Sequence, residues 1–175
     1  MGGKVKGTEL GVPMKRIIMH WTAGADGVND LEKDSYHFIV SRDGGVTQGK
    51  DKVEDNIPPL VRGKYAAHTW KLNSYSIGVS LDAMAGATER PFSWGDYPLT
   101  DKQVDALCLL VAALSTKHSV PVTPETVLTH AEVQPTLGVK QRNKWDITVL
   151  PGMNKVQDPR KVGDILREKI KGYLQ

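Results

Sequence analysis

Two histidines and one aspartate stand out in this sequence because their types and positions suit metal chemistry. His20 closes the hydrophobic segment 16–21, His130 follows the apolar segment 127–129, and Asp146 comes later, directly after a Lys-Trp pair. Two imidazoles and one carboxylate that leave a fourth position open form the ligand set of a catalytic zinc site. Zinc held in this way lowers the pKa of bound water to about 7 and polarises a carbonyl group, which makes amide hydrolysis feasible without a covalent nucleophile. The spacing alone leaves other interpretations open, because a lone histidine is often structural and Asp146 could be an ordinary loop carboxylate.

The elements that must position these residues are mostly strands. Apolar residues on both faces of residues 16–21 indicate a buried central strand, with His20 near its end. Further strands are expected at 36–40, 46–48, 76–81 and 127–129, with the turn residues 42–45 joining the second strand to the third as a hairpin. Loops are expected at 22–34, 83–98 and 131–143, and a loop or single helical turn at 56–62.

Two amphipathic helices complete the expected fold. Thr100 and Gln103 have the spacing of a capping box at the start of a helix over about 101–118. A second helix is expected over 159–173, and its inner face would carry Val162, Ile165, Leu166 and Ile170. The order of elements predicts an α/β fold with a central mixed β-sheet flanked by helices. We expect residues 1–175 to form a single domain with a flexible N-terminal arm at 1–13.

The composition indicates a globular protein and excludes several classes. Of the 175 residues, 39% are hydrophobic and 25% are charged, and the net charge of +3 would suit an anionic partner. Without a basic stripe or interleaved aromatic residues, we expect no nucleic-acid partner. No segment is apolar enough to insert into a membrane, and the polar N-terminus is not a secretory signal. We therefore expect synthesis in the cytoplasm without a signal peptide.

Four blocks of residues occur in an order that indicates a particular protein family. They are Ile17-Ile18-Met19-His20-Trp21-Thr22-Ala23; Tyr36-His37-Phe38-Ile39-Val40 with Asp43-Gly44; Ala66-Ala67-His68-Thr69-Trp70 with Asn73 and Ser76-Ile77-Gly78-Val79; and Thr129-His130 with Lys144-Trp145-Asp146. Together these blocks resemble the type-2 N-acetylmuramoyl-L-alanine amidases, a superfamily shared with phage T7-type lysozyme-amidases and peptidoglycan recognition proteins. The resemblance extends over about residues 15–146. It implies the α/β fold of these amidases and recognition proteins.

The resemblance also implies roles for individual residues. His20, His130 and Asp146 match the ligands of one Zn²⁺ ion. Lys144 matches a lysine that stabilises the oxyanion of the tetrahedral intermediate, where a cation lowers the barrier because negative charge develops there. Tyr36 matches a tyrosine that positions the attacking water. Solvated charge for Lys144 and simple packing for Tyr36 are the alternatives.

Substrate contacts are expected beside the ligands. Trp21 and Thr22 directly follow His20, and the family position of His68 suggests a cleft wall, although a satisfied surface histidine would look the same. His37 and His118 are expected to be structural. Cys108 is expected in the core, which argues against a Cys-His hydrolase.

The implied function is zinc-dependent hydrolysis of the amide between N-acetylmuramic acid and L-alanine in peptidoglycan. We expect a monomeric phage or prophage endolysin that reaches the cell wall or periplasm after holin-type release. A non-catalytic peptidoglycan-binding module and a cytoplasmic muropeptide-recycling amidase are the alternatives.

Three departures from the family pattern bear on the mechanism. Ser80 occupies a position where many bacterial members carry a glutamate, so Tyr36 or the zinc-bound hydroxide would have to act as the base. The segment 131–143 is expected to form an enlarged loop over the cleft. The segment 20–36 is short and is expected to leave little room for a helix.

Overall fold

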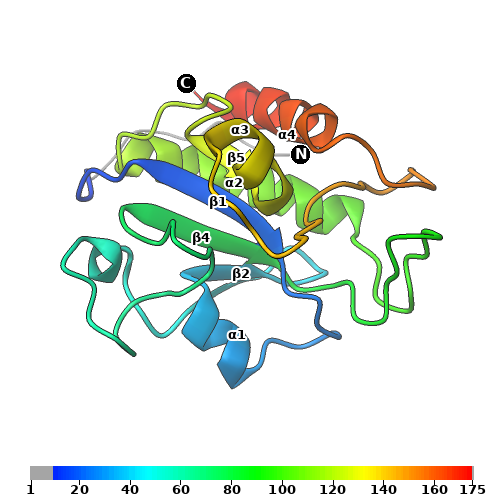
Figure 1. Ribbon diagram of the computed structural model, residues 1–175, viewed down its shortest axis with the longest axis horizontal. Helices are drawn as coiled ribbons and strands as arrows, with labels where there is room; N and C mark the ends of the chain where they lie inside the picture. The colour runs from blue at the N-terminus through cyan, green and yellow to red at the C-terminus, as the bar shows by residue number, and fades with distance from the viewer. Residues whose placement is uncertain (1–9, 175) are drawn as a thin grey trace.

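The computed structural model describes residues 10–174, which form a five-stranded mixed sheet with helices on both faces (Figure 1). The strands are β1 (Arg16–Trp21), β2 (Phe38–Val40), β3 (Val46–Gln48), β4 (Ser76–Leu81) and β5 (Val127–Thr129). Their spatial order is β3-β2-β4-β1-β5. The pairings β2–β4, β4–β1 and β1–β5 are parallel, and β3 runs antiparallel to β2. This arrangement confirms the predicted fold class.

The two long predicted helices are present. They are α2 (Asp101–Lys117) and α4 (Pro159–Tyr173), which pack against each other on one face of the sheet. The predicted capping box begins α2, since the Thr100 hydroxyl accepts a hydrogen bond from the Gln103 backbone N–H. A 3-10 turn, η1 (Val53–Asn56), ends at the first residue of the segment 56–62, where a loop or turn was expected. The prediction that Ile165 lies on the inner face of α4 is wrong, because its side chain is 41% exposed.

Two further helices occupy segments that were expected to be loops. The helix α1 (Asp30–Ser35) lies between β1 and β2, so the expectation that this segment is too short for a helix is wrong. The helix α3 (His130–Leu137) takes up the first part of the predicted loop 131–143. His130 is therefore the first residue of a helix that directly follows the strand at 127–129. The loop that remains before Asp146 is correspondingly shorter.

The alternation of side chains along β1 and β4 separates the core from the site. Ile17, Met19 and Trp21 point toward the main core, which also contains residues of β4, α2 and α4. Ile18 belongs to a smaller cluster on the other face, with Leu128 and Val133 as its buried partners. Since side chains alternate between the two faces of a strand, His20 lies on the same face as Ile18. The main core thus fixes the strand from one side and leaves His20 free for chemistry on the other.

The segments around the sheet add three findings. Residues 1–9 of the predicted arm lie outside the described residues, while the Gly11 N–H donates to the Lys117 carbonyl and the ring of His118 bonds the Val12 carbonyl. The predicted strand 36–40 begins at Phe38. Among residues 10–174, no helix is both long and apolar enough to cross a membrane.

Candidate active site

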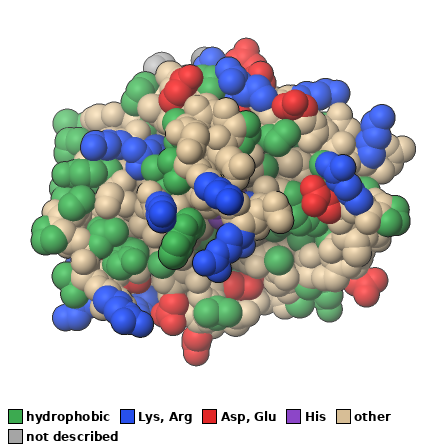
Figure 2. Space-filling view, viewed as in Figure 1, with side chains coloured by type: hydrophobic (Ala, Val, Ile, Leu, Met, Phe, Trp, Pro, Cys, Tyr) green, Lys and Arg blue, Asp and Glu red, His purple; other side chains and the backbone are tan. Residues whose placement is uncertain are grey.

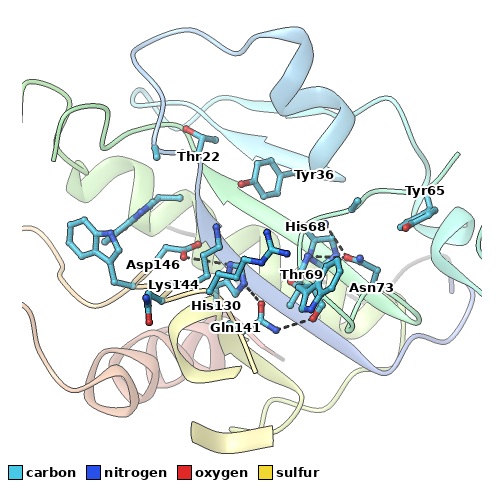
Figure 3. Close-up of a pocket in the computed structure, with 17 residues that line it drawn as sticks. Thr22, Tyr36, Tyr65, His68, Thr69, Asn73, His130, Gln141, Lys144 and Asp146 are labelled. Atoms are coloured by element: carbon cyan, nitrogen blue, oxygen red, sulfur yellow. Dashed lines mark hydrogen bonds and ion pairs between the residues drawn. The ribbon is translucent and has the colours of Figure 1, made fainter. Parts of the chain in front are cut away.

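A cleft of about 590 Å³ opens at the carboxyl ends of the parallel strands β1 and β5 (Figure 3). Its lining comes from the loop after β1, the segment 65–73, the start of α3 and the segment 141–146. Ligands of open α/β sheets bind at this end of the strands, because loops diverge there and leave a crevice. All of the predicted site residues except His20 line the cleft, and His20 lies beneath it at 1% exposure.

The structure brings the three predicted ligands together at the bottom of this cleft. The Nδ1 atom of His20 lies 3.1 Å from Nδ1 of His130 and 3.3 Å from Oδ2 of Asp146. Nδ1 of His130 lies 3.5 Å from Oδ1 of Asp146. All three side chains are buried, and one ligand atom from each lies within 4.8 Å of the others. No other group of three such residues occurs within the described part of the chain.

Different elements hold these three ligands. His20 comes from β1, and His130 opens α3 directly after β5. The carbonyl of Asp146 accepts a hydrogen bond of 2.6 Å from the backbone N–H of Ala131. The segment that carries the third ligand is therefore tied to the helix that carries the second.

His68 supports His20 from the side away from the other ligands. Nε2 of His20 lies 3.1 Å from Nδ1 of His68, and Nε2 of His68 lies 3.3 Å from the carbonyl oxygen of Ser76. A carbonyl oxygen only accepts hydrogen bonds, so Nε2 of His68 carries a proton and its Nδ1 accepts one. The Thr69 hydroxyl lies 2.8 Å from this same acceptor, and a proton on Nε2 of His20 directed at it leaves a free lone pair on Nδ1 of His20. The ring of His68 lies directly over Gly78, where a Cβ atom would approach it to 2.4 Å.

The electrostatics of the cluster suit a bound cation. Burial lowers the pKa of His20 to about 4, against the opposing effect of Asp146, so the ring is neutral near pH 7. Burial alone would raise the pKa of Asp146, but the two imidazoles beside it outweigh this effect and lower that pKa below its usual range. Neutral imidazole and carboxylate are the forms that bind metals. The donor set and its open side toward the cleft fit a catalytic zinc ion.

Tyr36 and Ser80 lie beside the cluster. The ring centroids of Tyr36 and His20 are 5.2 Å apart, and Figure 3 shows Tyr36 across the cleft from Lys144 and Asp146. Burial raises the pKa of the Tyr36 phenol above its usual range, and the neighbouring Ser80 hydroxyl offsets only part of this. Ser80 pairs with His20 in the register of β4 and β1. Its Oγ is the one buried side-chain polar atom among residues 10–174 without a hydrogen-bond partner.

The mouth of the cleft is positively charged. Lys144 and Arg142 are exposed residues that line it, and Arg142 lies over the ring of Trp70 at 5.2 Å from the centroid. Asp146 is the only acidic residue among the described residues that line the cleft. Figure 2 shows a small histidine surface inside a hollow that lysine and arginine side chains border.

The predicted substrate contacts have additional structural tasks. Trp21 is 5% exposed and makes an edge contact with Trp145 at 4.7 Å between ring centroids. The Thr22 hydroxyl donates to Asp82 and accepts from the N–H of Gly24, which holds the loop after β1. Trp21, Thr22 and His68 all line the cleft, where a substrate could reach them. Their contact with a substrate stays a prediction.

One residue of this site was missed by the sequence analysis. Gln141 is buried beside His130, with its Oε1 atom 2.8 Å from Nε2 of the ring. No motif or periodicity marks a single glutamine in a loop, so its position emerges only from the folded structure. The residues expected to be structural behave as such: His37 bonds Asn56 and the N–H of Gly78, and Cys108 is fully buried.

Comparison with known proteins gives this geometry its context. The family model described as N-acetylmuramoyl-L-alanine amidase matches residues 10–152, which include all three candidate ligands. The chain belongs to this amidase family. The amidase assignment confirms the resemblance found in the sequence and agrees with a buried His-His-Asp cluster suited to a metal. No curated protein matches the chain.

Solved structures share the fold of this amidase at low sequence identity. The N-acetylmuramoyl-L-alanine amidase LysC from Clostridium intestinale is 17% identical with a TM-score of 0.52, and the match covers 97% of this chain and 96% of that one. The endolysin amidase LysCS from the same organism is 16% identical with a TM-score of 0.52, covering 97% and 94%. The Staphylococcus aureus hydrolase AmiA is 15% identical with a TM-score of 0.53, covering 93% and 77%. At these identities the comparisons establish the fold.

Proposed function

We propose that this amidase is zinc-dependent and hydrolyses the amide between N-acetylmuramic acid and L-alanine in peptidoglycan. The observation that carries the proposal is the cluster of His20, His130 and Asp146 at the bottom of a cleft, in a chain of the amidase family. The three side chains supply two imidazole nitrogens and one carboxylate and leave the cleft side open. This is the ligand arrangement of catalytic zinc sites in hydrolases.

Zinc at these residues would supply Lewis-acid polarisation of the scissile carbonyl and a water of lowered pKa. The protein's own contribution lies in the groups around the cluster. Lys144 lies at the mouth of the cleft, where its ammonium group can stabilise negative charge that develops on the carbonyl oxygen. Tyr36 faces the cluster from the other side, and its phenol stays protonated, so it can orient a water or the substrate carbonyl by donating a hydrogen bond.

The walls of the cleft suit a polymer with sugar and peptide parts. Figure 3 shows Thr22 at one end of the cleft and Tyr65 and Asn73 at the other, and Trp21 and Trp70 also belong to the lining. We assign Trp21, Thr22 and His68 to substrate contact. The two cations at the mouth would attract the carboxylates of a peptide stem.

The test is digestion of purified Gram-negative sacculi before chelation, after chelation and after zinc is added back. We expect release of peptides that begin with L-alanine, identified by mass spectrometry, and this release should stop with the chelator and return with zinc. Protein that binds sacculi without releasing peptides would replace the proposal with a non-catalytic recognition module. Cleavage that persists after complete removal of the metal would rule out zinc dependence.

We further propose that the physiological role is that of a phage or prophage endolysin, which acts as a monomer on the cell wall after holin-type release. The shared fold with the endolysin amidase LysCS supports this role. Activity on intact sacculi and on soluble anhydro-muropeptides distinguishes an endolysin from a muropeptide-recycling amidase. Rapid digestion of sacculi is expected of an endolysin, whereas activity confined to the soluble fragments would assign the protein to muropeptide recycling.

A further inference from the structure

Gln141 is a buried amide among exposed neighbours in a loop. Its neighbours Lys140, Arg142, Asn143 and Lys144 are all exposed, whereas Gln141 is 6% exposed. Burying an amide is unfavourable unless both of its polar ends form hydrogen bonds. Both ends do so. Oε1 of Gln141 lies 2.8 Å from Nε2 of His130, and Nε2 of Gln141 donates to the carbonyl of Trp70 at 2.9 Å (Figure 3).

These two contacts determine which way the amide points. The carbonyl oxygen of Trp70 can only accept a hydrogen bond, so the NH₂ group of Gln141 must face it. The oxygen of Gln141 then faces His130, and this oxygen can also only accept. His130 must therefore carry its proton on Nε2, which leaves the lone pair of Nδ1 directed at His20 and Asp146.

The same logic operates on the other imidazole of the cluster. The carbonyl of Ser76 makes Nδ1 of His68 an acceptor that faces Nε2 of His20, and the Thr69 hydroxyl lies beside the same nitrogen. Each imidazole thus ends a hydrogen-bond chain that starts at a backbone carbonyl, and each presents Nδ1 to the same point. Outer hydrogen bonds of this kind fix the tautomer and orientation of metal-binding histidines.

We propose that Gln141 is a positioning residue that holds His130 in the tautomer and orientation required to bind the metal. This inference rests on the proposed zinc-dependent function. Through its bond to Trp70, Gln141 also joins the loop 138–145 to the segment 66–73 across the cleft. One side chain therefore connects two segments that line the cleft and also orients His130.

Three variants separate the two contacts of Gln141. Gln141→Met removes both hydrogen bonds with little change in volume. Gln141→Glu retains an acceptor for His130 and loses the donor to Trp70. Gln134→Met is the matched control, because Gln134 accepts a bond from the backbone N–H of Gln141 at 2.9 Å and so supports the loop without bonding His130. Far-ultraviolet circular dichroism checks that each variant folds.

The first readout is zinc affinity, measured by competition with a chromophoric chelator. We expect Gln141→Met to weaken zinc binding about 10- to 100-fold, the range found when outer partners of metal-binding histidines are removed. Gln141→Glu and Gln134→Met should both stay within about threefold of the native value, since both preserve an acceptor for the imidazole. An unchanged zinc affinity in Gln141→Met would overturn the proposal.

The second readout needs neither metal nor activity. Long-range ¹H–¹⁵N correlation spectra of the chelator-treated protein near pH 8 report which imidazole nitrogen carries the proton, and His130→Gln supplies the assignment. We expect the Nε2–H tautomer for His130 in the native protein and a mixture of tautomers in Gln141→Met. A native His130 protonated on Nδ1 would equally overturn the proposal. If the native chain binds no zinc, the proposed function fails, and the spectra alone decide the role of Gln141.

Discussion

The carboxylate of Glu132 and the guanidinium of Arg167 form a two-point ion pair beneath the start of α3. Nη1 of Arg167 lies 3.0 Å from Oε1 of Glu132, and Nη2 lies 2.8 Å from Oε2. Both side chains are almost fully buried, at 0% and 3% exposure. Glu132 also accepts a hydrogen bond from the backbone N–H of Thr129, so the pair anchors the turn that presents His130.

We predict that Arg167→Met destabilises the protein by about 3 kcal/mol, because it leaves the carboxylate of Glu132 buried without a positively charged partner. Urea unfolding followed by circular dichroism measures the change. Arg160→Met is the matched control, since Arg160 forms an exposed ion pair with Asp164 and its loss should alter the free energy of unfolding by less than about 1 kcal/mol. Equal effects of the two substitutions would contradict a special role for the buried pair.

Removal of a ligand should separate metal binding from folding. In Asp146→Ala we expect loss of stoichiometric zinc binding and of peptide release from sacculi, because the carboxylate is one of the three proposed zinc ligands. The fold should persist, since the main core lies on the opposite face of the sheet from His20. Equilibrium dialysis with metal analysis and a circular dichroism spectrum provide the measurements. Native zinc stoichiometry in this variant would show that the assignment of Asp146 is wrong.

Lys144 offers a test of charge stabilisation. We predict that Lys144→Met lowers kcat by about 100-fold or more with little change in zinc content, as expected for loss of a group that stabilises the transition state. Lys140→Met is the control, because Lys140 is an exposed lysine of the same loop that lies outside the lining of the cleft. Similar losses in both variants would instead indicate that the general positive charge of the loop attracts the substrate.

The sequence predicted the central strands well because their residues follow simple physical rules. The apolar run Ile17-Ile18-Met19 in β1 covers both faces of the strand, which is typical of the middle of a parallel sheet, and in β4 apolar residues alternate with small ones. The helices α1 and α3 were missed because each is short and carries polar residues. Their capping signals were nevertheless present, since Asn29 precedes Glu32 by three residues and Thr129 precedes Glu132 by the same spacing.

Some residues of the site could be predicted from the sequence and others could not. His20, His130 and Asp146 were recognised because their neighbours form motifs of a known family. Gln141 has no such neighbours, and its role depends on the path of a loop that local patterns do not determine. The second function of His68, as the partner of His20, depends likewise on the close approach of its ring to Gly78.

His37 should make the stability of the protein depend on pH. Burial lowers the pKa of His37 to about 4 from a reference value of 6.5, although Asn56 and nearby acidic residues oppose this shift. The unfolded chain therefore binds a proton below about pH 6.5 that the folded protein does not bind until about pH 4. Stability from this group is complete above pH 6.5 and is lost as the pH falls toward 4, by up to about 3 kcal/mol.

The measurement is the free energy of unfolding in urea at pH 7.5 and pH 5.0, with a chelator present. His37→Gln should lose about 2 kcal/mol less than the native protein between these two conditions, because its amide does not titrate. An identical pH dependence in the variant would assign the effect to other groups.

The single cysteine provides a probe of opening that is independent of the active site. Cys108 lies on α2 with 0% exposure, and burial raises the pKa of its thiol to about 12. The thiolate is the reactive form, so the native protein should react with a disulfide reagent at pH 8 only when the core opens. We expect stoichiometric labelling within minutes in concentrated urea and almost none in buffer over the same time.

In Arg167→Met the rate of Cys108 labelling in buffer should rise, since α4 covers Cys108 and the carbonyl of Leu166 is in contact with its sulfur. Rapid labelling of the native protein would show that α2 and α4 separate without global unfolding.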